Sequence, residues 1–264
     1  MSQSNQDEEY LKLLTNPLKN CLNYKPKFGR GTGLNKLEFQ RLYGADPFYS
    51  WLGLDSPLIY TAHKAAGGIT SIYRQIGVGC ERLIQHLIAD NLELNASQSR
   101  WSYQIQESSG KTRTLSLDCR IKLADLSPNK RPQVESWLQQ ACSFTGVSVE
   151  VSKILKGAVF EVRQGYKSKD SKRQNADLAN AAAAYSQAYL PVLLLLSTQM
   201  DTNVSDSYKN ARWLILYGNT TGSSIDSTYE FCRQILNYDL ADFFQRNSSI
   251  LKQEVELVLQ ALLN

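Results

Sequence analysis

The chain has few of the residues on which metal and disulfide chemistry usually depends. Its 264 residues include only two histidines and five cysteines, and no two cysteines form a Cys-x-x-Cys pair. This scarcity argues against a structural zinc site, which needs four such ligands. Because the cysteines are odd in number and dispersed, and no amino-terminal signal segment is evident, we expect free thiols in a cytoplasmic protein.

Long hydrophobic runs are also missing. The longest, residues 190–196, is too short to cross a bilayer and contains Pro191. No internal repeat or low-complexity tract is present, which argues against repeat architectures. The formal net charge is +4, which permits a polyanionic partner without requiring one. We therefore expect no membrane span, and one large domain or a core with a smaller appended part.

Apolar residues are plentiful enough for a substantial core, at 42% of the chain. Residues 1–9 are polar, and we expect them to be frayed. The order of helical and strand patterns predicts an α/β fold, with a mixed central β-sheet flanked by helices. Helical patterns cover residues 35–43, 70–92, 134–141, 175–188, 227–237 and 249–263, with Gly77 and Gly79 interrupting the second. Strand patterns cover residues 101–105, 112–123, 147–151, 158–162, 190–196 and 212–217.

Two predicted strands carry a carboxylate on their polar face. In residues 112–123 apolar and polar residues alternate, and Asp118 lies on the polar side. Aspartate is a poor strand former, so its position there calls for a reason. In the strand over residues 158–162, Glu161 lies opposite the apolar face and shares its side with Arg163. Solvated acids or salt bridges within the sheet are the alternatives.

The strand that carries Glu161 leads into a segment crowded with positive charge. Seven Lys or Arg and two acids stand between Lys153 and Arg173. The segment can be an ordinary solvated loop, but a carboxylate among cations also suits a divalent metal that acts on a phosphate chain. A glycine-rich stretch from Lys25 to Gly33, which includes Arg30, also suits phosphate contacts. It is not a P-loop, because the Gly-Lys-Ser/Thr ending is absent.

The order of these parts resembles the core of the PD-(D/E)XK nucleases. Glu81 on a helix, Asp118 on a strand, the triplet Glu161-Val-Arg163 on a second strand, and then a helix and a strand follow that pattern over roughly residues 70–200. The basic run after Arg163 is most similar to type II restriction endonucleases. The resemblance implies a restriction endonuclease-like core, Mg²⁺-dependent hydrolysis of double-stranded DNA at a specific, palindromic site, and a homodimer. Mn²⁺ is expected to substitute for Mg²⁺.

The resemblance also implies roles for individual residues. In the family, two acids on adjacent strands bind magnesium, and Asp118 and Glu161 match them. Glu81 matches the helix carboxylate that some members add to the metal site. A lysine two residues after the second acid orients or deprotonates the attacking water in the family.

Two positions depart from the family pattern. Leu117, in place of proline, precedes Asp118, and Arg163 stands where the lysine is expected. Because arginine stays protonated, Arg163 can stabilise charge on the phosphate but cannot act as a simple base. We expect Lys167 or Lys169 to supply the missing amine.

Sequence specificity is expected from polar residues outside the catalytic set, because catalytic groups contact phosphates and not bases. Arginine and lysine suit guanine, and glutamine and asparagine suit adenine. We expect residues 1–69 to form a helical and loop region for DNA binding or dimerisation, and residues 70–264 to form the catalytic core with C-terminal helices. The candidate DNA contacts are Gln164, Lys169, Lys172, Arg173, Gln174, Asn175, Lys64 and Arg30.

Other assignments stay open. Glu150 is an alternative to Glu161, but the lysine that follows it is three residues on and would point to the other face of a strand. A junction resolvase or a transposase-type nuclease with the same core would use the same metal site. A DNA-binding protein without catalysis, in which Arg163 marks a decayed active site, is the alternative from another class.

Overall fold

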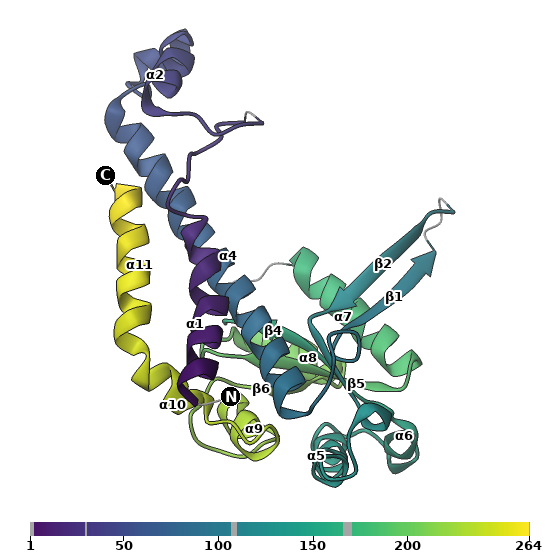
Figure 1. Ribbon diagram of the computed structural model, residues 1–264. Coiled ribbons are helices and arrows are strands. Elements are labelled where there is room, and N and C mark those ends of the chain that lie inside the picture. The colour runs from purple at the N-terminus through teal and green to yellow at the C-terminus, as the bar shows by residue number, and fades with distance from the viewer. Residues whose placement is uncertain (1–2, 30, 107–109, 166–170, 264) are drawn as a thin grey trace. The chain divides into compact units, whose positions relative to one another are not determined.

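The structure is a computed structural model, and it describes residues 3–29, 31–106, 110–165 and 171–263 (Figure 1). The chain divides into two compact units: one comprises residues 1–79 and 246–264, and the other comprises residues 80–245. The sequence suggested a division near residue 69, with the C-terminal helices in the catalytic part. In the structure the last helix instead groups with the N-terminal segment, because their apolar side chains share a cluster.

The first unit is helical. It contains α1 (Gln3–Lys19), α2 (Lys36–Gly44), α3 (Pro47–Trp51), most of α4 (Pro57–Asn91) and α11 (Ser248–Leu263). Its core cluster joins α1, α4 and α11 through Leu18, Ile72 and Val258. The expected fraying of residues 1–9 is wrong for the described part, since α1 begins at Gln3. The carboxylate of Asp7 holds this end by accepting a 2.6 Å hydrogen bond from Nε of Arg246.

The second unit contains the strands and the candidate site. Its strands are β1 (Trp101–Gln106), β2 (Thr112–Leu117), β3 (Cys119–Lys122), β4 (Gly157–Arg163), β5 (Tyr189–Leu195) and β6 (Leu214–Leu216). Its helices after α4 are α5 (Arg131–Phe144), α6 (Val149–Ile154), α7 (Ser171–Ser186), α8 (Thr202–Asn210), α9 (Thr228–Gln234) and α10 (Leu240–Arg246), with a 3₁₀ turn at Leu123–Asp125. The α/β fold with a mixed sheet and flanking helices is confirmed.

Four strands form one sheet in the order β3-β4-β5-β6. Strand β4 runs antiparallel to β3 and parallel to β5, and β5 is parallel to β6, so the sheet is mixed. Strands β1 and β2 form a separate antiparallel hairpin. Every residue of β5 is buried, as its unbroken apolar composition predicted for a central strand.

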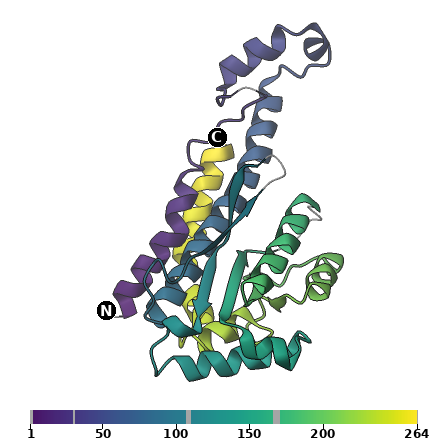
Figure 2. The same ribbon diagram turned by 90° about the vertical axis from the view of Figure 1, so that its right-hand side faces the viewer.

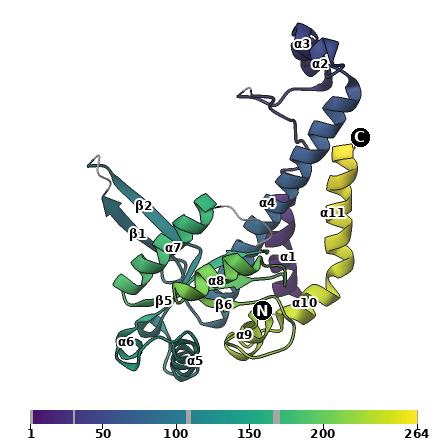
Figure 3. The same ribbon diagram turned by 180° about the vertical axis from the view of Figure 1, so that it is seen from behind.

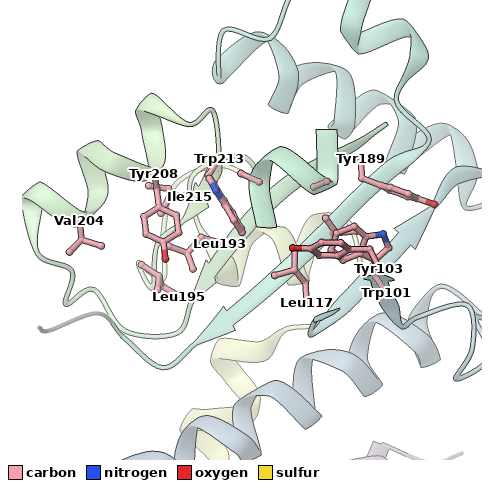
Figure 4. Close-up of a cluster of buried hydrophobic side chains, with 13 residues drawn as sticks. Trp101, Tyr103, Leu117, Tyr189, Leu193, Leu195, Val204, Tyr208, Trp213 and Ile215 are labelled. Carbon is pink, nitrogen blue, oxygen red and sulfur yellow. The ribbon is translucent and has the colours of Figure 1, made fainter. Parts of the chain in front are cut away.

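Helices cover both faces of the sheet. On one face, Leu193 and Ile215 pack with Ala184 of α7 and Val204 of α8 (Figures 3 and 4). On the other face, aromatic rings from three elements meet: Trp137 of α5, Phe160 of β4 and Phe231 of α9. Their ring centroids lie 4.9–6.2 Å apart. Because side chains alternate along β4, Phe160 faces these rings while its neighbours Val159 and Glu161 face α7 and α8.

Several predicted elements need correction. The strand expected over residues 112–123 is divided by a bend at Asp118, because a short polar side chain that bonds to backbone favours a break in a ladder. The strand expected at residues 147–151 is helix α6, whose first turn is capped by the Ser148 hydroxyl. Helix α4 runs through Gly77 and Gly79 without a break. Helices α1, α3, α8 and α10 were not predicted individually.

The described residues contain no helix that is long and apolar enough to span a membrane. The five cysteines are buried and free of disulfides.

Candidate active site

Asp118 and Glu161 face each other where β3 meets β4. Cys119 is paired with Phe160 in the antiparallel register, so the residues next to them, Asp118 and Glu161, are neighbours across the two strands. The amide of Asp118 donates to the carbonyl of Phe160 at 2.9 Å. The amide of Val162 in turn donates to Oδ2 of Asp118 at 2.7 Å. These bonds hold the Asp118 carboxylate against the backbone of β4, beside Glu161.

Arg163 lies between two buried carboxylates. It is two residues after Glu161 and therefore shares its face of β4, where Nη2 forms an ion pair with Oε1 of Glu161. The same nitrogen lies 3.6 Å from Oδ1 of Asp177 on α7. Tyr208 of α8 donates its hydroxyl to the other oxygen of Asp177. Nε of Arg163 is buried and has no hydrogen-bond partner among the described residues, so within this part of the chain the ion pairs contribute most to holding the guanidinium.

A helix adds a further carboxylate to this region. Glu81 on α4 contributes to raising the pKa of Glu161 and the pKa of Cys119 through its negative charge. One turn later on the same face of α4, Gln85 directs its amide towards the carbonyl oxygen of Asp118, at 3.5 Å. The helix, the bend and the strand thus bring the three predicted acidic residues into one region.

Negative charge outweighs positive charge among the described groups of this region. Burial is the largest cause that raises the pKa of Glu161 well above its ordinary value near 4.5, and the carboxylate of Asp118 is the next. Asp177 and Glu81 raise this pKa further, and only the Arg163 guanidinium opposes them. Three carboxylates thus raise the pKa of Glu161 and one guanidinium lowers it, and an additional positive charge would relieve the repulsion.

This electrostatic arrangement predicts a pH-dependent stability. Because the pKa of Glu161 is higher in the folded protein than in the unfolded chain, the folded state binds more protons above pH 4.5. The contribution of Glu161 to the free energy of unfolding should be greatest below about pH 4.5. It should fall as the pH rises from there through the folded-state pKa of Glu161. Chemical denaturation at a series of pH values, with a chelator present, measures this fall. Glu161→Gln should flatten it, whereas parallel profiles for the two proteins would contradict the prediction.

A polar cavity of about 640 Å³ adjoins Asp118. Its lining includes Gln85 of α4, Ser102 and Ser116 from the hairpin, and the cations Arg100 and Arg120. Arg120 is held in place by the carbonyl of Gln98 at 3.0 Å. The cavity thus places hydroxyls, an amide and guanidinium groups beside one of the two opposed carboxylates.

The other predicted residues have varied positions. Gln164 directly follows β4, whereas Lys167, Lys169 and Arg30 lie outside the described residues. The backbone of Lys172, Arg173, Gln174 and Asn175 belongs to α7, but their side chains are outside the described part. Lys64 belongs to the helical unit, where it donates to the carbonyl of Ala261 at 3.0 Å.

Glu150 is not a strand residue. It lies exposed in the first turn of α6. Its carboxylate lies at the solvated start of a helix and not in the region of Asp118. The structure therefore does not support Glu150 in place of Glu161 as the second acid of the site.

Sequence reasoning missed Asp177 and Tyr208. Asp177 shares one face of α7 with Asn180, Ala181 and Ala184, all of which are buried. In the sequence, Asp177 interrupts a row of small apolar residues at helical spacing, and this interruption is the signal that could have identified it. Its partner Tyr208 could not be identified, because α8 itself was not predicted.

No group of three or more His, Cys, Asp or Glu side chains within the described ranges is arranged to hold a metal ion. Comparison of the chain with protein-family models, with curated proteins and with solved structures gave no match.

Proposed function

We propose that the protein is a Mg²⁺-dependent endonuclease that cleaves double-stranded DNA at a specific site, with an active centre of the PD-(D/E)XK type. The observation that carries the proposal is the opposition of Asp118 and Glu161 across β3 and β4, with Asp118 the largest charged contributor to the raised pKa of Glu161. Two acids that repel each other in a buried setting are suited to share a cation.

The donor set fits magnesium. Mg²⁺ prefers oxygen ligands, keeps several waters and is usually held by one or two carboxylates together with substrate phosphates. Asp118 and Glu161 would hold it, with Glu81 close enough to act electrostatically on Glu161. When bound, Mg²⁺ supplies positive charge to the phosphate oxygens and makes a bound water more acidic.

The chain's own residues position and stabilise the reacting groups. The amide of Val162 fixes Asp118, and burial between sheet and helices restricts Glu161. Arg163 remains protonated, so its role is to balance the carboxylates and stabilise negative charge on the phosphate. The base that accepts the proton from water is assigned, as a hypothesis, to Lys167 or Lys169. Alanine at each, with cleavage and binding measured separately, distinguishes a chemical role from a binding role.

One observation favours a second candidate, a DNA-binding protein without cleavage. Arg163 already engages Glu161 and lies 3.6 Å from Asp177, which is the arrangement of a buried ion cluster with a structural role. Such a protein would bind duplex DNA tightly and lose affinity steeply with salt, yet leave the strands intact. A nuclease that acts on branched DNA is a third candidate with the same metal site.

Action on a palindromic site would require two copies related by twofold symmetry, so we infer a homodimer on DNA. We infer that the protein would act on its DNA substrate in the cytoplasm.

Digestion of unmethylated plasmid DNA tests the proposal. Incubation with Mg²⁺ should yield discrete fragments whose sequenced ends share one motif, and Mn²⁺ should substitute for Mg²⁺. Excess chelator should stop the reaction, because removing Mg²⁺ would remove the positive charge that stabilises the phosphate oxygens and makes the bound water more acidic. Intact plasmid with both ions would refute the nuclease, and cleavage of branched junctions alone would indicate the third candidate.

A further inference from the structure

One face of the β1–β2 hairpin packs against the core through its described side chains near the base of the hairpin. The paired residues Trp101 and Leu117, and next to them Tyr103 with Leu115, contact the core cluster that includes Ala181 of α7 (Figure 4). The hydroxyl of Tyr103 also donates to Oδ1 of Asn180 at 2.6 Å. This face therefore fixes the hairpin to α7.

The opposite face is polar, uncharged and exposed. It consists of three cross-strand pairs that carry only hydroxyl and amide groups, and in Figures 1 and 2 the hairpin extends away from the four-stranded sheet. The pairs are Ser102 with Ser116, Gln104 with Thr114, and Gln106 with Thr112. All six side chains are exposed and carry hydrogen-bond donors and acceptors but no charge.

The polar face adjoins the candidate active site at its base. Ser102 and Ser116, its innermost pair, line the cavity beside Asp118. The cavity also contains Arg100, which is exposed and suited to a phosphate. The row of hydroxyl and amide groups thus begins beside Asp118, which is proposed to hold the metal ion, and runs outward along the hairpin.

We propose that this face reads base edges in the major groove of the DNA, with Gln104 and Gln106 directed at adenines. The inference rests on the proposed nuclease function and adds its specificity element. The major groove admits a two-stranded β-ribbon, glutamine pairs with N6 and N7 of adenine through two hydrogen bonds, and threonine contacts either a base edge or the thymine methyl. The absence of carboxylates on this face avoids repulsion of phosphates. Base recognition thus belongs to the hairpin in addition to the residues after Arg163.

Cleavage selectivity tests this assignment. Sequenced ends from a wild-type digest define the consensus site, and synthetic duplexes then carry that site or a version with one A·T pair replaced by G·C. Gln104→Ala and Gln106→Ala should each lower the cleavage rate on the consensus by about 10–100-fold and remove discrimination at one A·T pair. Gln139→Ala, which alters an exposed glutamine on α5, is the matched control and should change neither quantity.

The outcomes separate the two proposals. Retained cleavage with wild-type selectivity in both hairpin variants would overturn the hairpin assignment alone, as would a consensus without A·T pairs. A wild-type protein that cleaves no duplex would overturn the nuclease itself and the assignment that depends on it. The exposed positions make misfolding an implausible cause of loss, and an unchanged thermal unfolding midpoint checks this directly.

Discussion

Replacing Glu161 by glutamine is expected to lower the proposed DNA cleavage by about 1,000-fold in rate, which corresponds to roughly 4 kcal/mol of transition-state stabilisation. The change keeps the shape of the side chain but removes the negative charge that would hold a cation opposite Asp118. Arg163 keeps Asp177 as a partner at 3.6 Å, and the neutralisation relieves the repulsion from Asp118, so it should not unfold the protein. Single-turnover cleavage of the consensus duplex in Mg²⁺ measures the loss. Asp118→Asn should give a loss of similar size.

The matched control is Glu150→Gln, which neutralises an exposed acid in α6. It should cleave at the wild-type rate. DNA affinity, measured separately by fluorescence anisotropy, should be retained in Glu161→Gln because the substitution leaves the basic residues proposed to contact phosphates unaltered. Wild-type cleavage by Glu161→Gln would show that the opposed acids do not form the hydrolytic centre.

Replacing Arg163 by methionine is expected to lower the free energy of unfolding by about 3–5 kcal/mol. Methionine fills a similar volume, but Glu161 and Asp177 lose the cation that lies between them in a buried setting. Removing one member of a buried ion cluster leaves the remaining charges uncompensated, and this penalty exceeds the value of the intact pair. Urea denaturation at neutral pH in the presence of a chelator measures the change.

Two further variants separate charge from packing. In Arg163→Met combined with Glu161→Gln, one of the uncompensated charges is gone, so the double variant should be more stable than Arg163→Met alone. Arg131→Met removes an exposed helix pair with Glu135, 3.6 Å apart, and should cost at most about 1 kcal/mol. If Arg163→Met were as stable as Arg131→Met, the buried cluster would not have the electrostatic role assigned to it.

Periodicity predicted the central strands of the fold well. The alternation around Phe160 and the unbroken apolar run of β5 reflect burial that is decided locally, by which side chains avoid water. The strands of the hairpin, expected over residues 101–105 and 112–123, and α5, expected over residues 134–141, were also predicted from their apolar patterns.

Other elements depend on contacts that no local pattern reveals. The valines of α6 alternate with polar residues as in a strand, but a serine cap and the packing of the neighbouring α5 make this segment helical. Within the site, the two predicted acids and Arg163 come together because one bend and one strand position them. Asp177 approaches from a helix after the basic segment, and only tertiary packing determines that it meets Arg163.

Strand β4 imposes opposite demands on adjacent positions. Phe160 belongs among aromatic rings and Glu161 among charged groups, and the two are separated only by the pleat of the strand. An inserted or deleted residue within β4 would exchange the two faces, forcing a carboxylate into the aromatic cluster and a ring against Arg163. Length variation among descendants of this chain should therefore collect in the surface loops and spare the seven residues of β4.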